Sequence, residues 1–222
     1  MTDSIKKLFQ NIKELVFTVK CPYCGKVINK TEYACKKCKT KFPQKSIRDY
    51  AVGGYKCAVA FPYDGIFRKA VLNFKFRNRG EYAKQLAFPV VQAVIEIFGD
   101  EINNFDIITA VPMHKKSIKA RGYNQSELIA RQCSIIMNIP YCETLVKFKE
   151  NKTQHSIKAT ERAQNVKGVY KTIDKKLIAD KHVLIIDDII TTGNTLGECA
   201  KILTKDGCKK VSCATVCCVI IK

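Results

Sequence analysis

The chain has 222 residues, 46% of them hydrophobic, which is enough for one domain with a full core and a small satellite that cannot fold by burial alone. Its apolar runs are shorter than the roughly 20 residues that span a bilayer, and charged residues interrupt its N-terminal stretch. We therefore expect a cytoplasmic protein without membrane insertion. In that reducing compartment the 12 cysteines indicate metal binding or packing rather than a disulfide scaffold.

The formal net charge is +19. Such a positive field attracts nucleic acid, anionic lipid or phosphorylated ligands. Only seven of the 39 basic residues are Arg, however, and lysines scattered over polar faces also arise from composition bias. Charge alone leaves both interpretations open.

The first predicted unit, residues 1–50, consists of an N-terminal helix and a zinc knuckle. The knuckle contains two C-x-x-C pairs: Cys21 with Cys24, and Cys35 with Cys38. Four thiolates suit tetrahedral zinc, and a zinc with all four positions filled would be structural. The alternative is two pairs of redox-active or packed cysteines. It is disfavoured because a unit this small needs a metal or another cross-link to be stable. We interpret the other eight cysteines as small apolar core residues.

The second predicted unit, residues 51–222, begins near a Gly53-Gly54 pair that we interpret as a hinge. Apolar residues at helical spacing predict one or two helices between Ala70 and Phe98, with a turn at 76–80. Strand and helix patterns then alternate, which indicates an α/β fold with a parallel sheet and crossover helices. The predicted elements are a strand at 106–111, a basic loop, a helix at 125–137 capped by Asn124, a strand at 182–187, a helix from 194 to about 205 with Gly207 at its C-cap, and a strand at 211–221.

The segment 183–195, VLIIDDIITTGNT, carries the clearest chemistry. Two carboxylates, Asp187 and Asp188, follow a buried strand, at the sheet edge where open α/β folds bind ligands. Adjacent carboxylates repel each other, so we expect ribose hydroxyls or a divalent cation to bind to both of them. Hydroxyls, a glycine and the amides of a helix N-terminus then form a cradle for a monophosphate: Thr191, Thr192, Gly193, Asn194 and Thr195. The pattern predicts a ribose 5-phosphate site; the alternative is that Asp188 and Thr191 only cap the helix.

A second candidate segment follows Val111 and reads Pro112, Met113, His114, Lys115. A basic loop with a histidine suits a diphosphate and its Mg2+. By themselves these residues are equally compatible with a surface histidine and a solvated lysine face.

Segment 183–195 resembles the 5-phosphoribosyl-1-pyrophosphate (PRPP) signature of type I phosphoribosyltransferases. The order of V-P-x-H at 111–114, R-G-x-N-Q at 121–125 and E-R-x-x-N-V-x-G at 161–168 further resembles the ComF family of bacterial competence-associated, phosphoribosyltransferase-like proteins. The resemblance extends over nearly the whole chain, including the N-terminal zinc knuckle and the segment 72–83.

The resemblance implies roles for single residues. Asp187 and Asp188 would contact the ribose hydroxyls of PRPP, 191–195 would hold its 5′-phosphate, and 112–115 would bind its pyrophosphate with Mg2+. A lid at 149–167 would close over the ligand. The lid and supporting residues would be Arg121, Asn124, Gln125, Gln154 and Arg162. Lysines in place of the family's other basic residues after V-P-x-H weaken a bidentate contact to phosphate.

Three functions fit this sequence. The first is an enzyme that transfers ribose 5-phosphate from PRPP, although no acceptor pocket can be identified. The second, implied by the ComF resemblance, is a role in DNA uptake during natural transformation, with single-stranded DNA on the basic surface and PRPP as ligand or regulator. The third is a zinc knuckle that docks a competence helicase. Aromatic residues near basic ones, most of which we expect in the core, are Tyr23, Tyr33, Phe42, Phe74, Phe76 and Tyr123.

Overall fold

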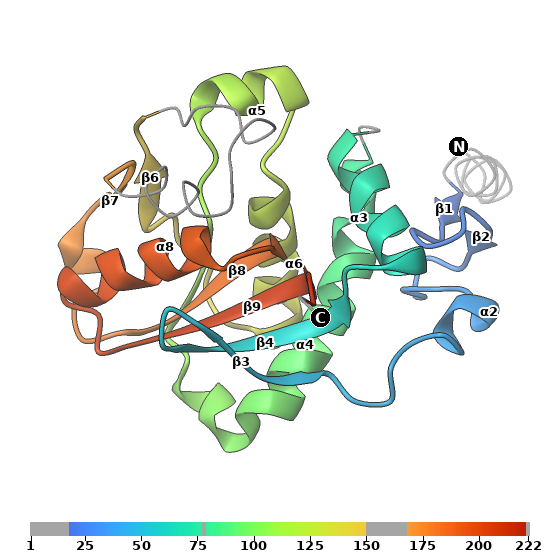
Figure 1. The fold of residues 1–222 in the computed structure, drawn as a ribbon, viewed down its shortest axis with the longest axis horizontal. Helices are drawn as coiled ribbons and strands as arrows, with labels where there is room; N and C mark the ends of the chain where they lie inside the picture. The colour runs from blue at the N-terminus through green and yellow to red at the C-terminus, as the bar shows by residue number, and fades with distance from the viewer. Residues whose placement is uncertain (1–17, 77–78, 150–167, 221–222) are drawn as a thin grey trace, which may run out of the picture.

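The computed structural model describes residues 18–76, 79–149 and 168–220, and its centre is a five-stranded sheet in the order β3-β4-β9-β8-β5 (Figure 1). Neighbouring strands from β4 to β5 run parallel, which confirms the predicted parallel sheet, while β3 is an antiparallel edge strand. The strands are β3 (Ile47–Val52), β4 (Tyr55–Pro62), β5 (Ile107–Ala110), β8 (His182–Ile190) and β9 (Lys210–Cys218).

Helices cover both faces of the sheet because side chains on its strands alternate between two buried clusters. Leu184 and Ile186 of β8 belong to the cluster shared with α4 (Ala83–Phe98) and α6 (Gln125–Met137). Val183 and Ile185 belong to the cluster under α8 (Asn194–Lys205), on the opposite face (Figure 1). Strand β8 is therefore buried on both sides, as its continuous apolar run predicts.

Local capping explains two helix boundaries that agree with the predicted ones. The Asn124 side chain accepts a hydrogen bond from the Ser126 backbone N–H at 3.2 Å and starts α6. Gly207 follows the end of α8 with a φ of 109°. The predicted helices between Ala70 and Phe98 are α3 (Gly65–Phe76) and α4. Within the described ranges, no helix has the length and apolarity to cross a bilayer.

The N-terminal knuckle consists of β1 (Val19–Lys20), β2 (Val27–Ile28) and α2 (Lys36–Lys39). Its Tyr23 is 1% exposed and makes edge contacts with Phe61 of β4 at 6.1 Å and Phe67 of α3 at 5.9 Å between ring centroids. The knuckle therefore shares a core with the larger unit. Strand β3 also spans residue 50, so separate folding of 1–50 and 51–222 stays a prediction.

Three predicted features differ from the structure. Gly53 and Gly54 are not a hinge but the turn of the β3–β4 hairpin, where φ values of 60° and 89° require glycine. Strand β8 does not end at Asp187 but pairs with β9 as far as Ile190, and the carboxylates stand within it. The basic segment after β5 forms a short helix, α5 (Lys115–Arg121), rather than a loop.

The remaining described elements are short. Strands β6 (Leu145–Lys147) and β7 (Tyr170–Thr172) form a two-stranded antiparallel ribbon. The predicted lid lies mostly outside the described residues. The 3-10 helices are η1 (Gly80–Tyr82), η2 (Gly99–Asn104) and η4 (Lys175–Leu177).

Candidate ligand-binding site

A cavity of about 650 Å³ opens at the carboxyl ends of β5 and β8. Helix α3 and the starts of α5, α6 and α8 contribute to its walls, so segments far apart in the chain meet there. The predicted site residues that line it are Asp187, Asp188, Thr191, Thr192, Gly193, Asn194, Thr195, Pro112, Met113, Arg121 and Asn124.

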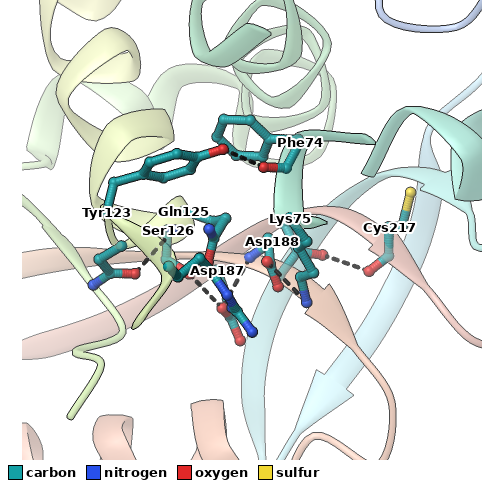
Figure 2. Close-up of polar contacts among 11 residues, drawn as sticks. Phe74, Lys75, Tyr123, Gln125, Ser126, Asp187, Asp188 and Cys217 are labelled. Carbon is teal, nitrogen blue, oxygen red and sulfur yellow. Dashed lines mark hydrogen bonds and ion pairs between the residues drawn. The ribbon is translucent and has the colours of Figure 1, made fainter. Parts of the chain in front are cut away.

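The two carboxylates stand at the floor of this cavity in different surroundings (Figure 2). One oxygen of Asp187 accepts hydrogen bonds from the Ser126 hydroxyl at 2.7 Å and from the Asp188 backbone N–H at 2.9 Å. Burial, followed by repulsion from Asp188, raises the pKa of Asp187 from 3.8 to about 7, although Ser126 opposes the shift. Its surroundings therefore favour the protonated form of Asp187 more than those of an ordinary aspartate do.

Asp188 instead forms an ion pair with Lys75 in the last turn of α3, with 2.9 Å between the ammonium nitrogen and a carboxylate oxygen. Figure 2 shows the Lys75 side chain reaching toward Asp188. Sequence reasoning did not assign Lys75 a role. The pair joins residues 113 positions apart (188 − 75), and the one available signal was that Lys75 lies in the family-like segment 72–83.

The loop before α8 is held in place by close packing. Gly193 has a φ of 76°, and a Cβ at this position would lie 3.1 Å from the Val52 side chain of β3. Its carbonyl accepts a hydrogen bond from the Gly197 backbone N–H at 2.8 Å and begins the helical hydrogen bonding. A side chain at 193 would therefore disturb the loop, and the helix N-terminus next to it presents amides to the cavity.

The R-G-x-N-Q segment, residues 121–125, mainly holds the elements around the cavity in place. The Asn124 amide donates to the Val111 carbonyl at 3.0 Å and so ties the end of β5 to the start of α6. Arg121 donates to Gln125 at 2.8 Å, and its guanidinium lies 5.4 Å from the Phe76 ring centroid. Arg121 and Asn124 line the cavity, whereas Gln125 is fully buried behind it. Gln154 and Arg162 lie outside the described residues.

The structure divides the predicted pyrophosphate segment. Pro112 and Met113 line the cavity, whereas His114 and Lys115 are not among its lining residues. His114 caps α5 by accepting a hydrogen bond from the Lys116 backbone N–H at 3.3 Å on its Nδ1. The helix thus has a structural use for the histidine, which the sequence pattern left open.

The four cysteines of the knuckle form a second candidate site. Their sulfur atoms lie within 4.8 Å of one another, and Cys24 and Cys35 are 3.6 Å apart. A hydrogen bond from the Cys38 backbone lowers the pKa of Cys35 to about 7, whereas burial raises the pKa of Cys38 and Cys21. A cation would offset the repulsion among four ionised thiols, so the cluster is able to hold a metal.

Comparisons with known proteins give a family match, sequence relatives and similar solved structures. Residues 117–220 match the family model for the phosphoribosyl transferase domain. Competence protein F of Haemophilus influenzae is 29% identical over 193 residues, which cover 86% of this chain and 82% of that protein. The DNA utilization protein YhgH of Escherichia coli K12 is 26% identical over 203 residues, 89% of this chain and 83% of that protein. A solved purine phosphoribosyltransferase from Pyrococcus horikoshii aligns at 19% identity and a TM-score of 0.36, over 60% of this chain and 70% of that one.

Three observations point to the same class of domain. They are the match to the family model, the relatives that align along most of the chain, and the parallel sheet with two carboxylates before a helix that starts at a glycine. The chain is therefore similar along most of its length to Competence protein F and the YhgH proteins, and residues 117–220 match the phosphoribosyl transferase domain.

Proposed function

We propose that this chain binds PRPP in the cavity at the carboxyl edge of its sheet and acts in the cytoplasm in DNA uptake. The observation that supports this most is that Asp187, Asp188 and the amides at the start of α8 line one cavity. Carboxylates accept hydrogen bonds from ribose hydroxyls, and a helix N-terminus suits a 5′-phosphate. A ribose 5-phosphate group has both features.

Mg2+ would enter with the diphosphate of PRPP. The donor set fits this cation because Asp187 and Asp188 supply carboxylate oxygens, which Mg2+ prefers. When bound, the ion would neutralise charge on the leaving pyrophosphate. The residues of the chain would position the sugar: Ser126 holds Asp187, and Asn124 fixes the adjoining strand end.

Transfer of the ribosyl group is the chemistry that this arrangement favours. An acceptor would attack C1, and the C1–O bond would break with its electron pair leaving on pyrophosphate. Fixed carboxylates near the sugar would stabilise the positive charge that develops on it. Tyr63, Leu72 and Phe76 are apolar lining residues of the same cavity, against which we propose that an acceptor would pack.

The biological setting comes from the relatives, whose names refer to competence and DNA utilization. An exposed aromatic supports DNA as a second ligand: Phe148, after β6, is 44% exposed. The ammonium groups of Lys149 and Lys171 lie 5.5 and 5.6 Å from its ring centroid. Aromatic rings beside cations suit the stacking of single-stranded bases. A helicase that docks on the zinc knuckle is a further partner we propose for that unit.

Our first prediction concerns PRPP. In calorimetric titrations with Mg2+ present, the wild-type protein should bind PRPP, and Asp187→Asn and Asp188→Asn should each weaken binding about tenfold or more, because each removes charge-assisted hydrogen bonds. The exposed Asp100→Asn variant serves as control and should bind normally. Pyrophosphate release in the same samples, with and without acceptors, reports catalysis. Absence of wild-type binding, or wild-type affinity in both Asp187→Asn and Asp188→Asn, would rule out the site.

A second prediction concerns zinc in the knuckle. Elemental analysis should find a single zinc per chain, and a chelator should lower the melting temperature because Tyr23 packs on β4 and α3. Cys24 is exposed, so Cys24→Ala should lose the metal without opening a core cavity. Cys142→Ala, which lies outside the cluster, should retain zinc. Zinc retained by Cys24→Ala at the wild-type level would argue against the four-cysteine site.

A third prediction concerns DNA. Fluorescence anisotropy with a single-stranded oligonucleotide should show affinity that falls as salt increases, and Phe148→Ala should weaken binding by about fivefold or more. Ile173 is also apolar and 50% exposed, close to β7, so Ile173→Ala provides a matched control. Binding that is insensitive to salt, or equal for Phe148→Ala and wild type, would exclude this surface.

A further inference from the structure

Lys75 is a half-buried cation in the lining of the cavity that carries the acidic pair. Its side chain is 21% exposed and that of its partner Asp188 is 9% exposed, and both line the cavity. Figure 2 shows the Lys75 side chain extending from α3 toward Asp188 in β8, on the side away from Ser126, which contacts Asp187. The Tyr123 hydroxyl donates to the Phe74 carbonyl next to Lys75, which fixes this end of α3 against the start of α6.

The Lys75–Asp188 ion pair is not expected to add much to the free energy of unfolding. Removing two charges from water costs several kcal/mol per ion, and the attraction between them often only offsets this cost. Burial is the largest single effect and lowers the pKa of Lys75, but Asp188 and Asp187 together raise it by more, so the pKa is raised from 10.5 and the ammonium stays charged at neutral pH. A permanent charge at a cavity wall is what a site for an anionic ligand requires.

The cavity lining combines both signs of charge. Besides the acidic pair it includes the start of α8 next to Thr191 to Thr195, whose amides suit an anion, and two cationic side chains, Lys75 and Arg121. The Arg121 guanidinium lies 5.4 Å from the ring centroid of Phe76, the neighbour of Lys75, and its charge repels that of Lys75. Two side-chain cations and a helix N-terminus around one acidic pair fit a sugar with an anionic group at each end.

We propose that Lys75 is a ligand-binding residue: its ammonium pairs with Asp188 in the ligand-free protein and binds the diphosphate when the ribose hydroxyls engage the carboxylates. This inference rests on the proposed PRPP site and extends it, because it assigns the end of the ligand opposite the 5′-phosphate to a residue of α3. Lys75 would therefore discriminate PRPP from ribose 5-phosphate, which has the same sugar and 5′-phosphate but no diphosphate.

Calorimetric titration of both ligands into three variants tests this. Lys75→Met keeps the length of the side chain without its charge, and Lys75→Arg keeps the charge. Lys69→Met changes an exposed lysine of the same helix and serves as the matched control. Lys75→Met should weaken PRPP binding about tenfold or more while ribose 5-phosphate loses less than about threefold. Lys75→Arg should restore most of the PRPP affinity, and Lys69→Met should equal wild type.

The outcomes separate this inference from the proposed function. If Lys75→Met weakens both ligands equally, or neither, Lys75 is a structural residue and the inference is wrong, while the PRPP site stands. If wild type binds neither ligand, the proposed function itself fails together with the inference. Circular dichroism melting of each variant distinguishes a folding defect, and loss of fold in Lys75→Met with full PRPP selectivity in Lys75→Arg would still support a charge-based role.

Discussion

Two adjacent carboxylates inside a strand that is buried on both faces are the constraint on which this site depends. Their mutual repulsion and the loss of water both oppose ionisation, so the surrounding structure has to supply compensation. It does so from opposite directions: Ser126 and a backbone N–H hold Asp187, while the ammonium of Lys75 holds Asp188. The contacts of Ser126 and Lys75 require α6 to begin and α3 to end at the same sheet edge.

The fold satisfies that requirement through β8. Strand β8 lies between β5 and β9, and helices on both faces bury its residues 182–186, up to the acidic pair. Asn124 ties β5 to α6 and thereby places Ser126, while Val52 packs against Gly193 and fixes the loop before α8. The knuckle contributes from further away, because Tyr23 packs on Phe67 in the helix that carries Lys75. A substitution at any of these contacts is therefore expected to shift the helix or loop that positions a group around the carboxylates.

Features encoded by neighbouring residues were predictable from the sequence, and features built from distant ones were not. The segment 183–195 and the two C-x-x-C pairs are continuous motifs, and α6 carries its own cap, so local chemistry identified them. The roles of Lys75 and Val52 depend on contacts with residues more than 100 positions away, for which a single sequence offers no spacing rule. The Gly53-Gly54 pair was a recognisable hairpin signal, but it was assigned to a hinge because the flanking strands were not identified.

Burial and repulsion from Asp188 both favour the protonated form of Asp187, and carboxyl carbon NMR measures this directly. The Asp187 signal, assigned by its loss in Asp187→Asn, should titrate with a midpoint near 7 in the ligand-free protein. Bound PRPP should shift the midpoint downward, because ribose hydroxyls stabilise the ionised carboxylate, and by linkage PRPP affinity should rise with pH across this window. A midpoint close to the ordinary value of 3.8 would show that the carboxylate is not held as described and would contradict this account.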